Sequence, residues 1–219
     1  MLRALFAEDA LGEIAVGSSF GTESAVLLHL VAKADAAIPV IFVDTLRMFP
    51  ETLAYRDTLI EAFGIKNATI VTPDAAVLAE KDENELRWSF DPVGCCAIRK
   101  VEPLARALES YDAWITGRRM DQSDARKDLN IVEEDPVHPG RIKINPLIHW
   151  TQADLWYYVE ENKVPHNRLY DEGYLSIGCA CCTRPCKEGD DERAGRWWWE
   201  NPEHKECGLH LNYKQGGGI

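Results

Sequence analysis

The stretch EIAVGSSFGTESAVLLHLVAKADAAIPVIFVDT, residues 13–45, carries the strongest fold signal in this chain. Its first apolar run, at 13–16, is short and stops at GSSFG, residues 17–21, whose glycines and serines are typical of a turn. Helical spacing of apolar residues begins at 22, and the run at 39–45 is typical of a buried strand. The stretch therefore predicts a strand, a loop of small residues, a helix and a second strand.

The same alternation continues along the first half of the chain. It predicts a helix at 51–64 that ends in glycine, a strand at 68–72, a helix from Asp74, a helix at 101–110 and a strand at 113–117. Strands that alternate with helices predict an α/β fold, with a mainly parallel sheet flanked by helices. In such folds, ligands bind at the carboxyl ends of the strands.

The later part of the chain has a different character. Residues 151–154 resemble a capping box with Asp in place of Glu, and they open a helix that continues to 162. Beyond 162 the periodicity is lost, and the segment is rich in Gly, Pro, Cys and Trp. A long irregular segment is usually functional or disordered, and the Trp and Cys content favours a function. Because no repeat or linker divides the sequence, we expect one domain over residues 1–219.

The charge balance restricts the kinds of ligand. The chain has 219 residues, with 36 Asp and Glu against 24 Lys and Arg, which gives a formal net charge of −12. A protein this acidic does not bind nucleic acid through its overall field, since phosphate contacts require a basic face. No apolar run could span a membrane and the N-terminus MLRALFAEDA does not resemble a signal peptide, so we expect a cytoplasmic protein. An anionic ligand would need a local cluster of cations.

The loop SSFGTES, residues 18–24, is a candidate anion site. Its small residues allow backbone N–H groups to converge, and the following helix adds the positive end of its dipole. The loop lacks the Gly-Lys-Ser/Thr ending of a Walker A motif. An ordinary turn between a strand and a helix is the alternative interpretation.

The seven cysteines point to metal or redox chemistry, because their number is odd and the sequence shows no secretory signal. An adjacent pair and a C-x-x-C pair stand out: Cys95, Cys96, Cys179 and Cys182. Four thiolates suit either a tetrahedral zinc ion or an iron–sulfur cluster. Since neighbouring side chains diverge, an adjacent pair chelates one small ion poorly, which favours a 4Fe–4S cluster over zinc. Cys181 and Cys186 fit no ligand spacing.

Cys207 is a candidate nucleophile in the motif ECGLH, with His210 close by. The thiolate is the reactive form of cysteine, and nearby cations lower its pKa. An inert thiol is the alternative. Basic residues that could supply cations follow strand ends and flank the cysteines: Arg99, Lys100, Arg118, Arg119, Arg126, Lys127, Arg184, Lys187, Arg193 and Arg196. Solvated surface charge is the alternative for each of them.

Taken in order, the motifs resemble those of a known family. They are SSFGTES, FVDT, CCAIRK, TGRRMDQSDAR, KINPLIHWT, PHNRLYDEGYLSIGCACCTRP, RAGRWWW and ECGLH. Together they are similar to the motifs of assimilatory adenylylsulfate reductases, which are related to the phosphoadenylylsulfate reductases. The resemblance runs from 14 to 210. It implies the adenine nucleotide α-hydrolase-like (PP-loop) fold, and one sulfonucleotide reductase domain whose mobile catalytic segment lies at about 188–219.

The resemblance also implies roles for individual residues. Substrate-binding roles fall on the loop, a strand end and four arginines: Ser18, Ser19, Phe20, Gly21, Ser24, Asp44, Thr45, Arg118, Arg119, Arg193 and Arg196. One 4Fe–4S cluster would be held by four thiolates: Cys95, Cys96, Cys179 and Cys182. Catalytic roles fall on Lys100, between cluster and substrate, on Cys207 as nucleophile and on His210 beside it.

The implied reaction is the reduction of adenylylsulfate to sulfite and AMP by thioredoxin or a similar dithiol protein, through an S-sulfocysteine on Cys207. It belongs to sulfate assimilation and cysteine biosynthesis, and we expect a homo-oligomer. Cluster cysteines accompany the unphosphorylated substrate in this family, although reduction of phosphoadenylylsulfate, or of both substrates, stays open. An ATP-dependent adenylating or thiolating enzyme of the same fold is a more distant alternative, disfavoured by Phe20 and Glu23 in the loop. A non-catalytic zinc-binding module is a third.

Overall fold

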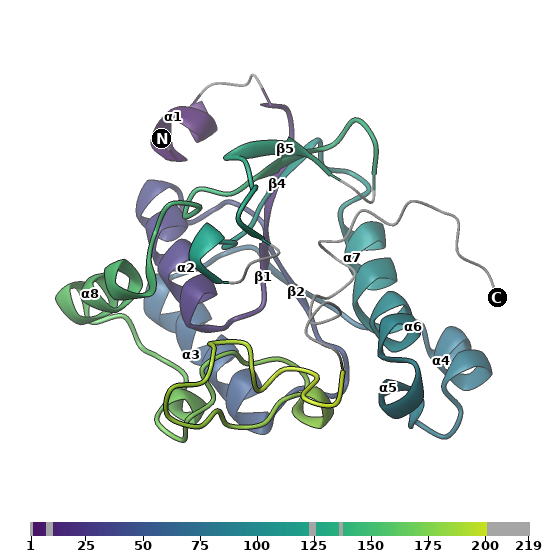
Figure 1. Cartoon of the computed structure of the whole chain (residues 1–219). Coiled ribbons are helices and arrows are strands. Elements are labelled where there is room, and N and C mark those ends of the chain that lie inside the picture. The colour runs from purple at the N-terminus through teal and green to yellow at the C-terminus, as the bar shows by residue number, and fades with distance from the viewer. Residues whose placement is uncertain (1, 8–10, 123–125, 136–137, 201–219) are drawn as a thin grey trace.

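The computed structural model describes residues 2–7, 11–122, 126–135 and 138–200 (Figure 1). The predicted nucleophile Cys207 and its neighbour His210 lie outside the described residues. In the part of the chain that is described, no helix has both the length and the apolar character needed to cross a membrane.

A six-stranded sheet lies at the centre of the described structure, with the strand order β3-β2-β1-β4-β6-β5. The strands are β1 (Ile14–Ser18), β2 (Val40–Val43), β3 (Ala68–Val71), β4 (Ala113–Ile115), β5 (Val132–Glu134) and β6 (Ile142–Ile144). All neighbouring pairs are parallel except β5 and β6, which are antiparallel at one edge. The mainly parallel sheet expected from the sequence is confirmed.

The two faces of the sheet are covered by different helices. The larger core lies under α2 (Thr22–Ala34), α3 (Pro50–Phe63) and α8 (Gln152–Asn162). The opposite face packs on α7 (Glu102–Ala107) through Ala15 and Trp114. Short α1 (Leu2–Ala7) lies beside α2 (Figure 1). Strand residues therefore serve the two faces alternately, as the two-residue period of a strand requires.

Helix ends follow the local sequence signals. Gly64 ends α3 with a φ of 62°, a left-handed conformation that suits glycine. Thr151 and Asp154 make both hydrogen bonds of a capping box at the start of α8, which confirms the expectation for this segment. The Asp74 side chain accepts hydrogen bonds from two backbone N–H groups and opens α4 (Ala75–Lys81).

The helix predicted at 101–110 begins earlier than expected. After α5 (Arg87–Phe90), α6 (Pro92–Cys96) runs through the π-helical turn η2 (Ala97–Val101) directly into α7. A π turn has an extra residue that changes the direction of the side chains, and such turns are frequent at functional sites. It lies between the adjacent cysteines and α7.

Two strands were not predicted. β5 and β6 have three residues each, too few for a periodic pattern, and β5 is largely exposed. β6 also contains a lysine, Lys143, which is fully buried with its ammonium 4.9 Å from the centre of the Trp114 ring.

From the end of α8 to residue 200, the described chain is irregular, as expected, but it is held in place by specific contacts. This described segment contains only the short 3₁₀ turns η5 (Arg168–Tyr170) and η6 (Ala180–Cys182). A bridge between Met48 and Cys179 attaches it to the chain that follows β2. Residues 183–200, here called the C-terminal loop, fold back on themselves through a bridge between Thr183 and Arg196. In Figure 1 this yellow-green segment lies at the lower edge, beside α3.

Candidate active site

A cavity of about 190 Å³ opens at the carboxyl ends of β1, β2 and β4. One side, the strand wall, consists of residues 17–24, 41–45 and 114–118, although not every residue in these ranges faces the cavity. The other side, the loop wall, consists of residues 176–178 and 193–197. This is the edge at which parallel α/β sheets bind ligands.

The loop between β1 and α2 lines the cavity with Ser18, Ser19, Gly21 and Ser24. Its hydroxyl groups hold the loop in place. Ser18 Oγ accepts a hydrogen bond from the Phe20 N–H at 3.1 Å, and the hydroxyls of Ser19 and Ser24 are 3.0 Å apart. Among the described residues, the N-cap position Gly21 makes no side-chain cap bond, which leaves the start of α2 open toward the cavity.

Phe20 differs from the other loop residues because its side chain packs in the core. It is 0% exposed and packs edge-on against Phe42, with ring centres 5.2 Å apart. Its φ of 51° lies in the left-handed region, which is strained for a bulky residue. Burial of the ring thus keeps the backbone of the loop in an uncommon conformation.

The two residues predicted at the end of β2 have different positions. Thr45 lines the cavity and lies 3.2 Å from the Cys179 sulfur through its hydroxyl. The Asp44 carboxylate accepts a hydrogen bond from the Leu46 N–H at 2.9 Å and does not line the cavity.

Of the four predicted arginines, three line the cavity: Arg118 from the strand wall, and Arg193 and Arg196 from the loop wall. Arg119 lies behind the strand wall, where its guanidinium is 0% exposed and is surrounded by acidic and carbonyl oxygens. Its predicted contact with the substrate stays a prediction.

Arg196 is held by an aromatic ring and keeps an unused donor. Its guanidinium lies 4.5 Å from the centre of the Trp197 ring. Among the described residues, its Nε has no hydrogen-bond partner although the side chain is buried. Gly178 leaves room for it, because a Cβ at that position would collide with the guanidinium. A buried donor without a partner is costly, and an anionic ligand would satisfy it.

The cysteines form a second pocket next to the cavity. It is lined by five thiols, three basic side chains, a proline and a tryptophan: Cys95, Cys96, Cys179, Cys181, Cys182, Arg47, Arg99, Lys100, Pro92 and Trp197. Lys100 and Trp197 line both pockets, so Lys100 lies between the cysteines and the cavity. The role that the resemblance implies for Lys100, between cluster and substrate, stays a prediction.

The four predicted ligands are buried, and they have the soft sulfur donors that an iron–sulfur cluster or zinc requires. Burial, and next the nearby Cys179, raise the pKa of the Cys95 thiol to about 11. Such a thiol is protonated at neutral pH, and a bound metal would stabilise its thiolate. The donors therefore fit a cluster in element, number and burial. Within the described residues, no group of three or more His, Cys, Asp or Glu side chains has the arrangement that holds a metal ion.

Comparison with known proteins agrees with this architecture. Residues 13–185 match the protein-family model described as "Phosphoadenosine phosphosulfate reductase domain". The chain belongs to this reductase family. The proteins named "Adenosine 5'-phosphosulfate reductase" from Chelativorans sp. (strain BNC1) and Mesorhizobium japonicum are 47% and 45% identical to it, each over 91% of this chain and over 80% and 77% of their own length. The resemblance inferred from the motifs is therefore confirmed.

Solved structures support the fold of the reductase family. The crystal structure of phosphoadenylyl-sulfate (PAPS) reductase from Candida auris, as a phosphate complex, has a TM-score of 0.69 and 30% identity, over 82% of this chain and 88% of that one. FMN adenylyltransferase from Candida glabrata shares the fold alone, with a TM-score of 0.60, 17% identity and coverage of 82% of this chain and 60% of that one. The predicted PP-loop fold class is confirmed.

The reductase domain brings into the cavity three further polar residues to which the family resemblance gave no role, although Arg126 was already named as a possible cation. They are Glu23, Gln122 from the turn η3 (Met120–Gln122) and Arg126. Gln122 links the other two, since its amide donates to Glu23 at 3.1 Å and its oxygen accepts from Arg126. All three lie within the motifs SSFGTES and TGRRMDQSDAR, but a motif does not show which of its side chains face the cavity.

Proposed function

We propose that the chain is an oxidoreductase that reduces adenylylsulfate to sulfite and AMP in sulfate assimilation. The observation that carries the proposal is the junction between the two pockets: a cation-lined cavity shares Lys100 and Trp197 with a pocket of buried cysteines. Similarity to the adenosine 5'-phosphosulfate reductases of Chelativorans and Mesorhizobium japonicum supports the substrate.

The cavity suits an adenine nucleotide that ends in a phosphosulfate. The apolar side chains of Ile41, Val43, Leu104 and Trp114 would accommodate the adenine. The start of α2 and the cations Arg118, Arg193, Arg196 and Lys100 would stabilise the phosphate and the sulfate. This local group of cations explains how a chain with a net charge of −12 can bind an anion.

The nucleophile in our proposal is the Cys207 thiolate, with His210 beside it. Its sulfur would form an S–S bond to the sulfuryl sulfur, while the S–O bond to AMP breaks and AMP leaves with the electron pair. Two anions approach each other in this step, and the cations of the cavity reduce their repulsion. A thiolate of thioredoxin, or of a similar dithiol protein, would then attack Cys207, releasing sulfite. The second thiol of the dithiol would free Cys207 and leave the dithiol oxidised.

We propose one 4Fe–4S cluster as the cofactor, held by Cys95, Cys96, Cys179 and Cys182. When bound, it would supply a charged group that tunes the field near Lys100. The Lys100 side chain, which faces both pockets, would transmit this field to the phosphosulfate. We also propose that the enzyme is a cytoplasmic homo-oligomer.

Phosphoadenylylsulfate is the second candidate substrate, alone or together with adenylylsulfate. The structural similarity to the Candida auris phosphoadenylyl-sulfate reductase, at 30% identity, favours it. The four cysteines favour the unphosphorylated substrate, because cluster cysteines accompany it in this family.

The test is a reductase assay on protein purified without oxygen. It supplies each sulfonucleotide in turn with thioredoxin and measures sulfite. We expect sulfite from adenylylsulfate, and we expect iron and acid-labile sulfide in the brown protein. Sulfite from phosphoadenylylsulfate alone would support the second candidate. Zinc without iron would contradict the cofactor proposal, and absence of sulfite with either substrate would contradict the function.

A further inference from the structure

Behind the strand wall, a buried arginine and two carboxyl groups connect the C-terminal loop to the rest of the molecule. Arg119 Nη2 lies 3.3 Å from Glu192 of the C-terminal loop and 3.9 Å from Glu23 of α2. The side chains of Glu192 and Glu23 are 15% and 21% exposed, whereas that of Arg119 is fully buried. We call Glu23, Arg119 and Glu192 the carboxyl clamp.

The two carboxyl groups of the clamp approach the same guanidinium nitrogen, Arg119 Nη2, and interact with each other. A hydrogen bond between carboxyl groups requires a proton on one of them, since two carboxylates have no donor. Burial, and next the charge of Glu23, raise the pKa of Glu192 to about 9. Burial disfavours the charged form of Glu23, but the hydrogen bond from Glu192 and the charge of Arg119 outweigh it, so the pKa of Glu23 is lowered. Of the two carboxyl groups, Glu192 has the raised pKa and would hold a shared proton.

The surroundings of the clamp are fixed by other parts of the fold. Arg119 also bonds to Asp121 at 3.3 Å and to the Gln152 side chain at the start of α8 at 2.9 Å. Gln122 donates to Glu23, and the charge of Arg119, and next that of Arg193 on the C-terminal loop, lower the pKa of Glu192 in opposition to burial. Arg119 is therefore bonded to η3 and α8 as well as to the C-terminal loop.

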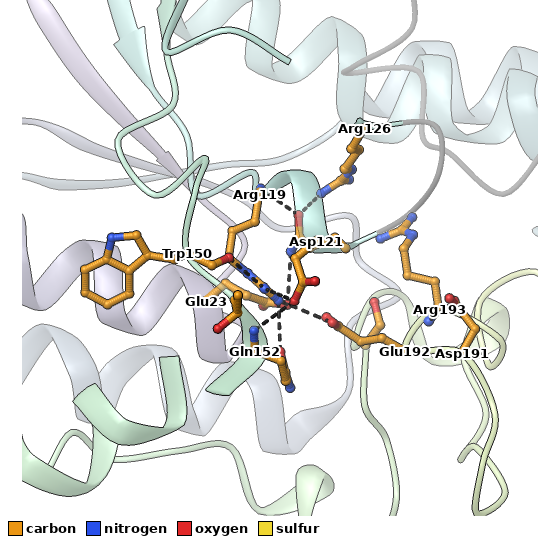
Figure 2. Close-up of polar contacts among 12 residues, drawn as sticks. Glu23, Arg119, Asp121, Arg126, Trp150, Gln152, Asp191, Glu192 and Arg193 are labelled. Carbon is orange, nitrogen blue, oxygen red and sulfur yellow. Dashed lines mark hydrogen bonds and ion pairs between the residues drawn. The ribbon is translucent and has the colours of Figure 1, made fainter. Parts of the chain in front are cut away.

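Glu192 immediately precedes an arginine of the cavity. Figure 2 shows Glu192 directed at Arg119, while Arg193 extends toward the side of Arg126. Arg193 and Arg126 both line the cavity. The Arg193 N–H donates to the Asp191 side chain at 2.8 Å, which stiffens the turn between them. Displacement of Glu192 would therefore displace Arg193 and, further along the same loop, Arg196.

We infer that Glu192 is a positioning residue: protonated and bonded to Glu23 over Arg119, it holds the C-terminal loop against the strand wall and so keeps Arg193 and Arg196 at the cavity. Docking of the loop then takes up one proton. The stabilisation from this proton is complete below the ordinary pKa of glutamate, decreases as pH rises, and is lost above the raised pKa of docked Glu192. Alkaline pH should therefore release the loop.

The first test measures loop docking without any substrate. Hydrogen exchange, detected by mass spectrometry of peptides that cover residues 183–200, is compared at each pH between wild type and Glu192→Gln. The glutamine amide can donate to Glu23 and does not titrate. In Glu192→Gln, the protection of residues 183–200, relative to exchange of an unprotected chain at the same pH, should therefore stay constant from pH 6 to pH 10. Wild-type protection should fall by up to about tenfold per pH unit over that range until Glu192 is ionised.

Three further variants test the assignment. Glu23→Gln removes the like charge beside Glu192, so the exchange protection of residues 183–200 should depend less on pH than in wild type. Glu192→Ala removes the contact and should expose the loop at every pH. Glu172→Gln, an exposed carboxylate outside the C-terminal loop, is the matched control and should behave as wild type. Equal pH dependence in wild type, Glu192→Gln and Glu23→Gln would overturn the inference.

The second test measures catalysis and rests on the proposed function. At pH 7.5, Glu192→Ala should raise KM for adenylylsulfate about tenfold or more, the loss expected for a hydrogen bond involving a charged group, with kcat changed less. Glu192→Gln should restore KM and remove its rise at alkaline pH. If wild type makes no sulfite, the proposed function is wrong, but the exchange test still shows whether the carboxyl clamp holds the C-terminal loop in place. If wild type is active and KM is unchanged in Glu192→Ala, the positioning role is wrong.

Discussion

The strand wall and the loop wall of the cavity are built in different ways. The strand wall consists of strand ends and a loop anchored in the core by the fully buried Phe20. The loop wall has no regular secondary structure beyond isolated bridges and is attached by a few contacts, such as those of Glu192 and the Met48–Cys179 bridge. The cations of one site therefore have separate structural origins: Arg118 belongs to a wall anchored in the core, whereas Arg193 and Arg196 belong to a wall attached by few contacts.

This comparison makes different predictions for the two walls. Substitutions in the strand wall should lower the stability of the whole fold, because its residues belong to the core. Substitutions in the loop wall, and in the chain that follows it, should reduce activity while the fold stays intact.

The largest effect is expected at Cys207, beyond the loop wall. Cys207→Ser should lower the rate of sulfite release by at least about 10³-fold, since a serine hydroxyl is a far weaker nucleophile than a thiolate at neutral pH. The thermal midpoint of unfolding should not change. Mass spectrometry of the wild type after adenylylsulfate alone should show a sulfonate adduct on Cys207. Release of AMP and sulfite by the variant at the wild-type rate would rule out this nucleophile.

The next effect is on stability, at the strand wall. Phe20→Ala should lower the free energy of unfolding by about 3–5 kcal/mol, as expected for removal of a buried aromatic ring. Urea denaturation followed by circular dichroism measures it. A loss below about 1 kcal/mol, with activity reduced, would mean that the ring serves the ligand and not the core.

Arg196 should show the opposite behaviour at the loop wall. Arg196→Ala should reduce kcat/KM for adenylylsulfate about 100-fold, the usual cost of one donor that stabilises developing negative charge. Stability should change little. Arg184→Ala is the matched control, because Arg184 also lies over a tryptophan, 5.4 Å from the Trp198 ring centre, but is exposed and does not line the cavity. Equal losses in both variants would show that the effect is not specific to the cavity.

The smallest effect is expected at Leu46, close to the Met48–Cys179 bridge that joins the two walls. This residue is exposed and has a φ of 60°, in the left-handed region that favours glycine. Leu46→Gly should change the free energy of unfolding by less than about 1 kcal/mol, since relief of strain offsets the added entropy of the unfolded chain. Sulfite production should be unaffected. Destabilisation by more than about 2 kcal/mol would show that the Leu46 side chain stabilises the junction.

Several features of the molecule were predictable because each depends on residues close together in the chain. Apolar periodicity gave the first four parallel strands and the helices between them, and Gly64, Asp74 and Thr151 gave helix ends. β5 and β6 were missed because three-residue strands have no period and because Lys143 hides the apolar character of β6. The family resemblance was also readable, because its motifs are contiguous.

The α/β class, the family, and the residue types available for an anion and for sulfur ligands can all be read from the amino-acid sequence. Which of two adjacent arginines meets the cavity depends on the folded chain, in which Arg118 faces the cavity while Arg119 is buried among carboxylates. The physical reason is that neighbouring residues at a strand end point in opposite directions, and their partners come from distant segments. Glu23 and Glu192 meet for the same reason, because folding alone brings α2 and the C-terminal loop together over Arg119.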